Sequence, residues 1–369
     1  MKSKKFIYGL CTLSGTIIGV GLFALPYITS QVGIFVILGY FLALGSLAIF
    51  VNLLFAEVAL KTPDFLRMPG FVKYHLGKKM SRISFMTFIL GMFGVLLTYL
   101  IIGGEFLNSL MAPIFGGNIT FYTLLYFAVG ALVIFSGSKT VARIEFLGLV
   151  LFFAVLLVIF YRGLPSFSFS NLLSCPSKRD FFLPYGPILF SLWGTALIPE
   201  IEEMLGKEKR LLKKIIPIAI FVPIVAYLSF IFLITGITGQ STSEEAITGL
   251  KDFLGNGIIN FALLFGLLTT FTSFIILGLT VRKVFHYDLK ISKRLAWAIT
   301  CFVPLFLFMA GLKDFIPVIA FVGGVFIGID GIFIIMMYQK IKKKIPLFTY
   351  PLIFFFVLGI IYQIIYFLR

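Results

Sequence analysis

The sequence feature that most constrains this chain is an apolar segment, residues 6–29, that glycine and proline interrupt. The segment is long enough to cross a lipid bilayer. Gly15, Gly19, Gly21 and Pro26 lie within it, however, and both residue types weaken a continuous helix. Irregular backbone at membrane depth is tolerated only where it is buried in protein or lines a water-filled cavity. The segment therefore predicts either a binding cavity at the break or a glycine-rich face packed closely on a neighbouring helix.

The composition is typical of a protein that crosses the membrane many times. Of 369 residues, 60% are hydrophobic and 12% are charged, and the mean hydropathy is +1.09. A soluble domain of this length would need far more polar surface. The three cysteines are far apart and the two histidines lie in polar connections, so we expect neither a disulfide framework nor a metal site. These residues are Cys11, Cys175, Cys301, His75 and His286.

Eleven apolar segments are separated by polar connections, and each approaches or exceeds the ~20 residues that a spanning helix needs. They cover residues 6–29, 33–60, 83–112, 120–136, 144–161, 181–199, 211–237, 257–281, 295–312, 315–338 and 345–368. We therefore expect an all-α polytopic membrane protein in which residues 1–369 form a single transmembrane domain of eleven helices.

The distribution of Lys and Arg predicts how the chain is oriented. If the N-terminus is cytoplasmic, the connections on that side hold 25 of the 31 basic residues, and the opposite side holds six. This bias predicts a multi-pass protein of the cytoplasmic membrane with its N-terminus inside the cell and its C-terminus outside. The same bias accounts for the net charge of +16, so the lipid bilayer is an expected partner and nucleic acid is not.

A second glycine–proline pair occurs in the sixth apolar segment. Gly194 precedes Pro199 by five residues, as Gly21 precedes Pro26, and the two glycines are 173 residues apart. This offset corresponds to five spans, which is an odd number, so the second unit enters the membrane from the opposite side. Matching interruptions in two halves indicate the binding site of a transporter built from inverted repeats. A chance coincidence of two glycines is the alternative.

The offset divides the chain into two repeats and one additional element. We expect the first repeat at about residues 6–162, the second at about 181–338, and an additional C-terminal helix at 345–368. In this arrangement the first and sixth spans are broken helices, and the substrate lies between their breaks near the membrane midplane.

Broken helices offer backbone groups that suit an amino acid. Freed amides at the start of a half-helix favour a carboxylate, and freed carbonyls favour an ammonium group or a small cation. Neither break contains a charged side chain, which favours a neutral amino acid, small or aromatic. The expected substrate-binding residues are Gly15, Thr16, Ile17, Gly19, Val20, Gly21, Ser191, Trp193, Gly194 and Thr195. For Trp193 three roles are open: contact with the substrate, a gate, or packing in the interior.

The first break resembles a known signature. The stretch from Ser14 to Pro26, Ser-Gly-Thr-Ile-Ile-Gly-Val-Gly-Leu-Phe-Ala-Leu-Pro, is similar to the first span of permeases of the amino acid–polyamine–organocation superfamily. The closest likeness is to the amino acid/auxin permease and aromatic amino acid (tyrosine/tryptophan) permease families. Three further stretches agree: Ala56-Glu57, residues 198–203 and Thr272-Ser273-Phe274. The resemblance implies the five-plus-five leucine-transporter fold, with broken helices 1 and 6 and an eleventh helix added.

Hydroxyl side chains in the eighth span form a candidate cation site. Thr269, Thr272 and Ser273 have the spacing that places them on one helix face, and hydroxyl and carbonyl oxygens are ligands that a small hard cation prefers. In sodium-coupled transporters of the kind the chain resembles, such a Thr-Ser pair joins carbonyls of the first span, which correspond here to Gly15 and Ile18. The alternative is that these hydroxyls bond carbonyls of the preceding helical turn.

Three acids are candidates for proton coupling. Asp330 is the one acid well inside an apolar segment, and an intramembrane acid is a functional candidate because burying it is costly. A structural hydrogen bond to nearby backbone is the alternative. Glu57 and Glu105 lie near the ends of the second and third spans, where each could instead reach the membrane interface.

These features predict a secondary active transporter that moves a small-molecule amino acid by alternating access, coupled to a gradient of H⁺ or Na⁺. An amino acid exchanger is the alternative within the same class. The sequence contains no phosphate-binding loop, zinc-binding helix, nucleophile elbow or catalytic histidine pair, which disfavours an enzyme. A transporter-like receptor is a third class, but it would not require matching breaks in two halves. No cofactor other than the coupling ion is expected, and the oligomeric state is left open.

Overall fold

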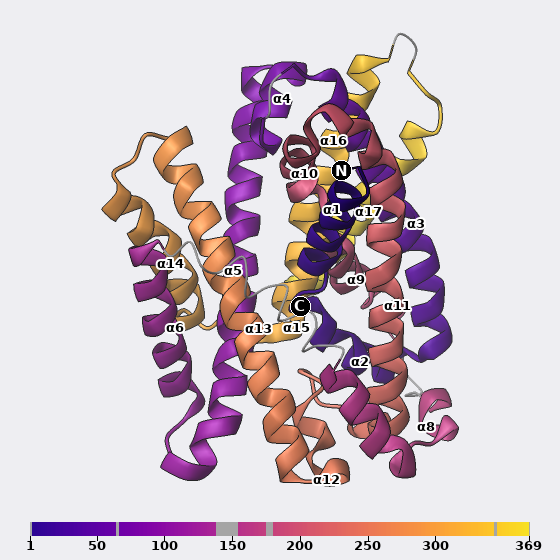
Figure 1. The fold of residues 1–369 in the computed structure, drawn as a ribbon, viewed down its shortest axis with the longest axis vertical. Helices are drawn as coiled ribbons and strands as arrows, with labels where there is room; N and C mark the ends of the chain where they lie inside the picture. Colours follow the sequence, from indigo (N-terminus) through magenta and orange to yellow (C-terminus); the bar gives the residue numbers. More distant parts are fainter. Residues whose placement is uncertain (1, 64–65, 138–153, 175–179, 343–344, 369) are drawn as a thin grey trace.

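The computed structural model describes residues 2–63, 66–137, 154–174, 180–342 and 345–368 (Figure 1). These residues form helices joined by short connections, and no β-strand occurs among them. The prediction of an all-α protein is therefore confirmed.

The first apolar segment forms two helices rather than one. These are α1 (Lys2–Ile17) and α2 (Gly21–Val32), and the chain bends by 54° between them. Residues 18–20 are not helical. Pro26 lies inside α2, so the break coincides with the glycines and not with the proline.

The sixth apolar segment is broken in a similar way. Helix α9 (Tyr185–Leu192) ends before Trp193, and a 3₁₀ turn, η2 (Thr195–Leu197), leads into α10 (Ile198–Leu205). Pro199 lies in the first turn of α10, where the missing backbone donor costs little. Both breaks predicted from glycine and proline are therefore present.

Four further helices of the first half are unbroken within the described residues. They are α3 (Ile34–Lys61), α4 (Met68–Leu76), α5 (Lys78–Phe115) and α6 (Ile119–Ser136). Local capping explains where α6 begins and ends. The Asn118 side chain accepts a hydrogen bond from the Phe121 amide at 2.9 Å, and Gly137 terminates the helix with a φ of 73°.

The second half continues with further helices. They are α11 (Leu212–Thr238), α12 (Lys251–Leu254), α13 (Asn256–Lys283), α14 (Lys293–Met309) and α17 (Thr349–Phe367). A short helix, α8 (Phe169–Leu173), precedes α9.

The tenth span contains a feature that the sequence did not predict. Helices α15 (Phe315–Phe321) and α16 (Gly328–Ile341) are joined by a π-helical segment, η7 (Val322–Ile327). A π segment within an α-helix is rare and often lies at a functional site. Here it lies one turn before Asp330.

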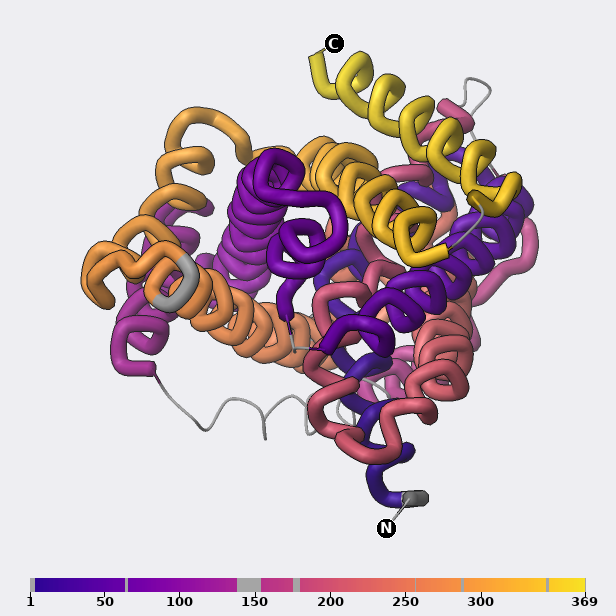
Figure 2. The backbone as a smooth tube through the Cα atoms, turned by 90° about the horizontal axis from the view of Figure 1, so that it is seen from above, coloured from indigo at the N-terminus to yellow at the C-terminus, as the bar shows by residue number. Residues whose placement is uncertain are grey.

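The helices pack in two groups with the tenth span between them (Figures 1 and 2). One group contains α1, α2, α3, α9, α10 and α11, and the other contains α5, α6, α13 and α14. Helices α15 and α16 and segment η7 contact both groups. In each expected repeat, the first and second spans thus belong to one group, and the third and fourth spans belong to the other. The repeat boundaries themselves stay a prediction.

Two glycines allow α9 and the tenth span to cross at backbone contact. A Cβ atom on Gly323 would overlap the Gly186 carbonyl oxygen, and a Cβ atom on Gly186 would lie 2.8 Å from the Ala320 carbonyl carbon. Close crossings of membrane helices use small residues in this way. The crossing fixes η7 against the broken sixth span.

The number of membrane spans stays a prediction. Within the described ranges, seven helices are long and apolar enough to cross a membrane, or eight if α1 and α2 form one bent span. One of the seven, Tyr185–Ser241, includes the break at Trp193 and Gly194 and contains two of the expected spans. Helix α14 has only 17 residues, and most of the expected fifth span, 144–161, lies outside the described residues.

The two ends of the molecule differ in the segments that they carry. The N-terminus, α4 and α10 lie at one end, here named the α4 end, and α8 and α12 lie at the other, the α12 end (Figure 1). The basic connections that hold α4 and α10 therefore share one end, as the predicted orientation requires.

Candidate substrate site

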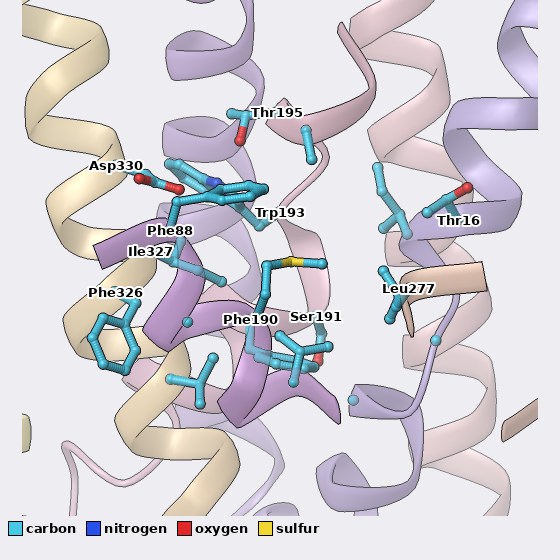
Figure 3. A pocket seen from close by; sticks show the side chains of 18 of the residues that line it. Thr16, Phe88, Phe190, Ser191, Trp193, Thr195, Leu277, Phe326, Ile327 and Asp330 are labelled. Carbon is cyan, nitrogen blue, oxygen red and sulfur yellow. The ribbon is translucent and has the colours of Figure 1, made fainter. Parts of the chain in front are cut away.

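A cavity of about 190 Å³ lies between the two breaks (Figure 3). Seven of the ten expected substrate residues line it: Thr16, Ile17, Gly19, Gly21, Ser191, Trp193 and Thr195. Gly15, Val20 and Gly194 do not line the cavity. Val20 is buried, and Gly194 faces the side chains of Leu13 and Ile17.

The floor of the cavity is formed where the two breaks touch. A Cβ atom on Gly21 would lie 3.0 Å from the Ser191 Cβ and would overlap its hydroxyl oxygen. The Ser191 hydroxyl donates to the Pro187 carbonyl at 2.7 Å, which holds the side chain in this place. Only glycine at position 21 permits the two broken helices to approach this closely.

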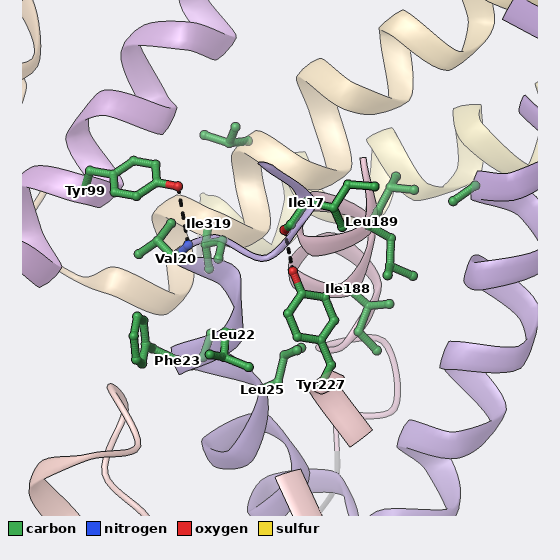
Figure 4. Close-up of a cluster of buried hydrophobic side chains, with 14 of the residues drawn as sticks. Ile17, Val20, Leu22, Phe23, Leu25, Tyr99, Ile188, Leu189, Tyr227 and Ile319 are labelled. Carbon is green, nitrogen blue, oxygen red and sulfur yellow. Dashed lines mark hydrogen bonds between the residues drawn. The ribbon is translucent and has the colours of Figure 1, made fainter. Parts of the chain in front are cut away.

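Two buried tyrosines fix the unwound backbone, and sequence analysis missed both. Tyr99 of α5 accepts a hydrogen bond from the Val20 amide at 3.4 Å, and its hydroxyl lies against Gly19 (Figure 4). Tyr227 of α11 is completely buried. Its hydroxyl bonds the Ile17 carbonyl of the first break and the Ser191 carbonyl of the second, the latter at 3.0 Å. The Tyr227 hydroxyl therefore links the two breaks. Its single proton is shared between the two carbonyl oxygens.

We expect Tyr227→Phe to destabilise the protein. The substitution keeps the ring but leaves two buried carbonyls without their donor, which typically costs about 1–3 kcal/mol per unsatisfied group. Thermal unfolding of the purified protein should shift to lower temperature. Tyr8→Phe on the exposed side of α1 is the matched control. Equal unfolding temperatures for both variants would contradict a structural role for this hydroxyl.

The cavity extends from the breaks toward the α4 end. Residues of α5 line it along one helix face, and they are Thr87, Phe88, Gly91, Met92, Val95 and Tyr99. Twelve residues of helix correspond to about 18 Å, and α5 begins at the α4 end. Thr16 and Ala196, which also line the cavity, are exposed. The cavity is therefore open toward the α4 end.

Packed aromatic rings close the cavity on the α12 side. Phe23 of α2 meets Phe106 at 5.0 Å and Phe230 at 6.3 Å between ring centroids, both edge to face. The three rings are at most 3% exposed. The connection after α11 adds a cover, because Ala246 and Leu250 are completely buried. Burial also raises the pKa of the Glu244 and Glu245 carboxyls in this connection.

The walls of the cavity are mainly apolar and aromatic. Besides the α5 face, they include Phe190, Ile276, Leu277, Val322, Phe326 and Ile327. Sequence analysis missed these residues because an apolar side chain that faces a cavity looks the same in sequence as one that faces lipid.

The structure brings one of the five candidate cation ligands to the cavity, Ser273. The Thr269 hydroxyl donates to the Gly266 carbonyl at 3.0 Å, and the Thr272 hydroxyl donates to the Thr269 carbonyl at 3.0 Å. These are bonds to the preceding turn, the alternative that the sequence left open. Gly15 and Ile18 do not line the cavity.

The three candidate acids have different surroundings. Asp330 lines the cavity, whereas Glu57 and Glu105 do not. Glu57 forms an ion pair with Lys342 at 2.8 Å, which joins the ends of α3 and α16, and a second with Lys61 of α3 at 3.4 Å. Glu105 has a buried carboxyl oxygen without a hydrogen-bond partner among the described residues.

Comparison with known proteins identifies related transporters. The chain is 23% identical over 341 residues to the tyrosine-specific transport system 1 of Haemophilus influenzae, covering 88% of this chain and 85% of that protein. It is 25% identical to the tyrosine-specific transport system 2 of the same organism, covering 70% of this chain and 64% of that protein.

Solved structures with the same fold are also transporters. The structure of MhsT in complex with L-phenylalanine superposes with a TM-score of 0.60 at 16% identity, covering 98% of this chain and 97% of that one. The inward-facing conformation of Mhp1 superposes with a TM-score of 0.70 at 12% identity, covering 98% and 88%. The fold is thus the leucine-transporter type that the resemblance of the first span implied.

The family follows from a comparison that spans nearly the whole sequence. Residues 2–365 match the model of the tryptophan/tyrosine permease family. This chain, with its two broken helices around a central cavity, belongs to the tryptophan/tyrosine permease family.

Proposed function

We propose that this protein is a secondary transporter that carries aromatic amino acids across the cell membrane by alternating access. The observation that carries the proposal is the cavity between the two breaks, which unites unwound backbone with aromatic walls. The family and the tyrosine-specific relatives support aromatic substrates.

The backbone at the breaks suits the charged groups of an amino acid. Helix α2 begins at Gly21, so its N-terminal amides present partial positive charge to a substrate carboxylate. Helices α1 and α9 end at Ile17 and Leu192, and their last carbonyls suit an ammonium group. The aromatic walls then take the substrate ring, since aromatic side chains offer large apolar contact areas.

The shape of the cavity supports an inward-open state. The cavity opens toward the α4 end, which carries the basic connections expected in the cytoplasm. The Phe23, Phe106 and Phe230 rings close the opposite side. Alternating access requires that the group containing α1 and α11 moves against the group containing α5 and α13, so that these rings separate while the α4 end closes.

The coupling ion is either H⁺ or Na⁺, and each of the two has a candidate residue at the cavity. Proton coupling would use Asp330, the candidate acid that lines the cavity. Sodium coupling would use Ser273 together with Thr272 and carbonyls of the first break. Amino acid exchange without an ion is the alternative.

Counterflow uptake into proteoliposomes tests the proposed function. Vesicles loaded with unlabelled tyrosine should accumulate radiolabelled tyrosine, and protein-free vesicles provide the control. Uptake of labelled tyrosine, tryptophan and phenylalanine that remains at the protein-free level, with protein shown to be folded, would contradict the proposal.

The same vesicles identify the coupling ion. We expect net uptake into unloaded vesicles to require either an inward pH gradient or an inward sodium gradient. Asp330→Asn should abolish the response to a pH gradient, and Ser273→Ala should reduce the response to sodium. Uptake that needs internal amino acid and responds to neither gradient would identify an exchanger and would contradict ion coupling.

A further inference from the structure

Two polar side chains of the cavity each have a buried atom with no hydrogen-bond partner in the described part of the chain. They are Oδ1 of Asp330 and Nε1 of Trp193. A carboxylate oxygen accepts hydrogen bonds, and an indole nitrogen can only donate one. Buried polar groups are nearly always paired in folded proteins, so this complementary pair requires an explanation.

The surroundings of the two atoms are aromatic. Figure 3 shows the carboxyl group of Asp330 pointing into the cavity, toward the rings of Phe88 and Trp193. Asp330 follows Phe326 by one turn of the tenth span, and Phe326 packs on Gly91 of α5. Unwound backbone thus forms the floor of the cavity. The Asp330 carboxyl lies farther toward the α4 end, about one helical turn beyond the Phe326 ring.

We propose that Asp330 and Trp193 recognise the ring hydroxyl of a tyrosine substrate. The phenol donates its proton to Oδ1 of Asp330, and its oxygen accepts the hydrogen of Nε1 of Trp193. A phenol is both donor and acceptor, which matches the two unpaired atoms. This inference rests on the proposed function, because it assumes that the amino acid backbone occupies the breaks and its ring occupies the cavity.

The pair discriminates among aromatic amino acids by their hydrogen-bonding capacity. Phenylalanine leaves both protein atoms unpaired. Tryptophan can donate to Asp330 but cannot accept from Trp193. A site built to bond a substrate hydroxyl rejects the analogue that lacks it, because the buried polar groups then stay unsatisfied. The expected order of affinity is tyrosine, then tryptophan, then phenylalanine.

Competition binding to the wild-type protein tests the inference without any substitution. The full chain, purified in detergent, binds radiolabelled tyrosine, and phenylalanine and O-methyltyrosine compete. O-methyltyrosine keeps the ring and oxygen but cannot donate. We expect both competitors to bind roughly 10- to 100-fold more weakly than tyrosine, as for hydrogen bonds to a charged group. Phenylalanine binding within twofold of tyrosine would overturn the inference while leaving the proposed function intact.

Two substitutions then assign the selectivity to the two residues. Asp330→Ala and Trp193→Phe should each bring the ratio of tyrosine to phenylalanine affinity closer to one. Tyr8→Phe, which removes a hydroxyl from the exposed side of α1 outside the cavity, is the control and should keep the ratio. If Asp330→Ala lowers both affinities by the same factor, the carboxyl acts in ion coupling or ammonium binding, and the inference is wrong. Failure of every aromatic amino acid to bind folded wild-type protein would instead reject the proposed function.

Discussion

Replacing Gly21 with leucine should abolish uptake of aromatic amino acids while the protein still inserts and folds. A side chain at this position enters the contact between the two breaks, where the Ser191 hydroxyl and Cβ already occupy the space. A leucine would push the broken helices apart or fill the cavity floor. Overpacking of this kind costs about 1–3 kcal/mol, and misplacing a positioning group by 1 Å can lower a rate by about 100-fold.

The measurement compares tyrosine counterflow by Gly21→Leu with that by Gly39→Leu. Gly39 lies on the exposed side of α3, and none of the described atoms approaches its Cβ position within 4 Å. The smaller change Gly21→Ala should also lower uptake. Adding Ser191→Gly should partly restore it, since this substitution removes the Ser191 side chain that the new methyl group would meet. Wild-type uptake by Gly21→Leu would show that the contact between the breaks does not form the site.

Gly323→Ala should prevent the protein from accumulating in a folded form. The added methyl group would overlap the backbone carbonyl oxygen of Gly186, and a backbone atom cannot rotate away as a side chain can. The expected cost is about 3 kcal/mol or more, at or above the upper end of ordinary overpacking. Since folded proteins are only marginally stable, this is a large fraction of the total.

Size-exclusion chromatography of the solubilised membrane fraction measures this effect. Gly257→Ala, at the exposed start of α13, is the control, because no described atom lies within 4 Å of its Cβ position. A monodisperse Gly323→Ala protein with a wild-type unfolding temperature would contradict the close crossing of α9 and η7. Gly194 differs from Gly323, because its nearest neighbours are the ends of the Leu13 and Ile17 side chains, which can move.

The breaks were predictable from sequence because they depend on local backbone chemistry. Gly19 and Gly194 permit non-helical conformations, and the equal spacing of Gly21 to Pro26 and of Gly194 to Pro199 identified the two breaks as related. The apolar segments between polar connections likewise predicted the helices. The π segment at residues 322–327 was not predictable, because its residues are ordinary for a membrane helix and its conformation depends on packing against α9 and α17.

The side chains that complete the site depend on contacts between distant segments. Tyr227 is one of 15 tyrosines, and its role follows only from the place where α11 passes behind both breaks. Glu57 and Asp330 were both candidates for proton coupling in the sequence, Glu57 near the end of a span and Asp330 well inside one. The structure separates them, because Glu57 pairs with Lys342, a residue 285 positions away, whereas Asp330 lines the cavity.

The central claim is that the cavity between the breaks binds the transported amino acid, and cysteine protection tests it most directly. Thr16→Cys, in a protein whose native cysteines have been replaced and whose tyrosine uptake is verified, places a thiol on the exposed cavity wall. We predict that tyrosine slows the labelling of this thiol by a membrane-permeant maleimide in a saturable manner, and that glutamate does not. A labelling rate that saturating tyrosine leaves unchanged, in vesicles that transport tyrosine, would contradict the claim.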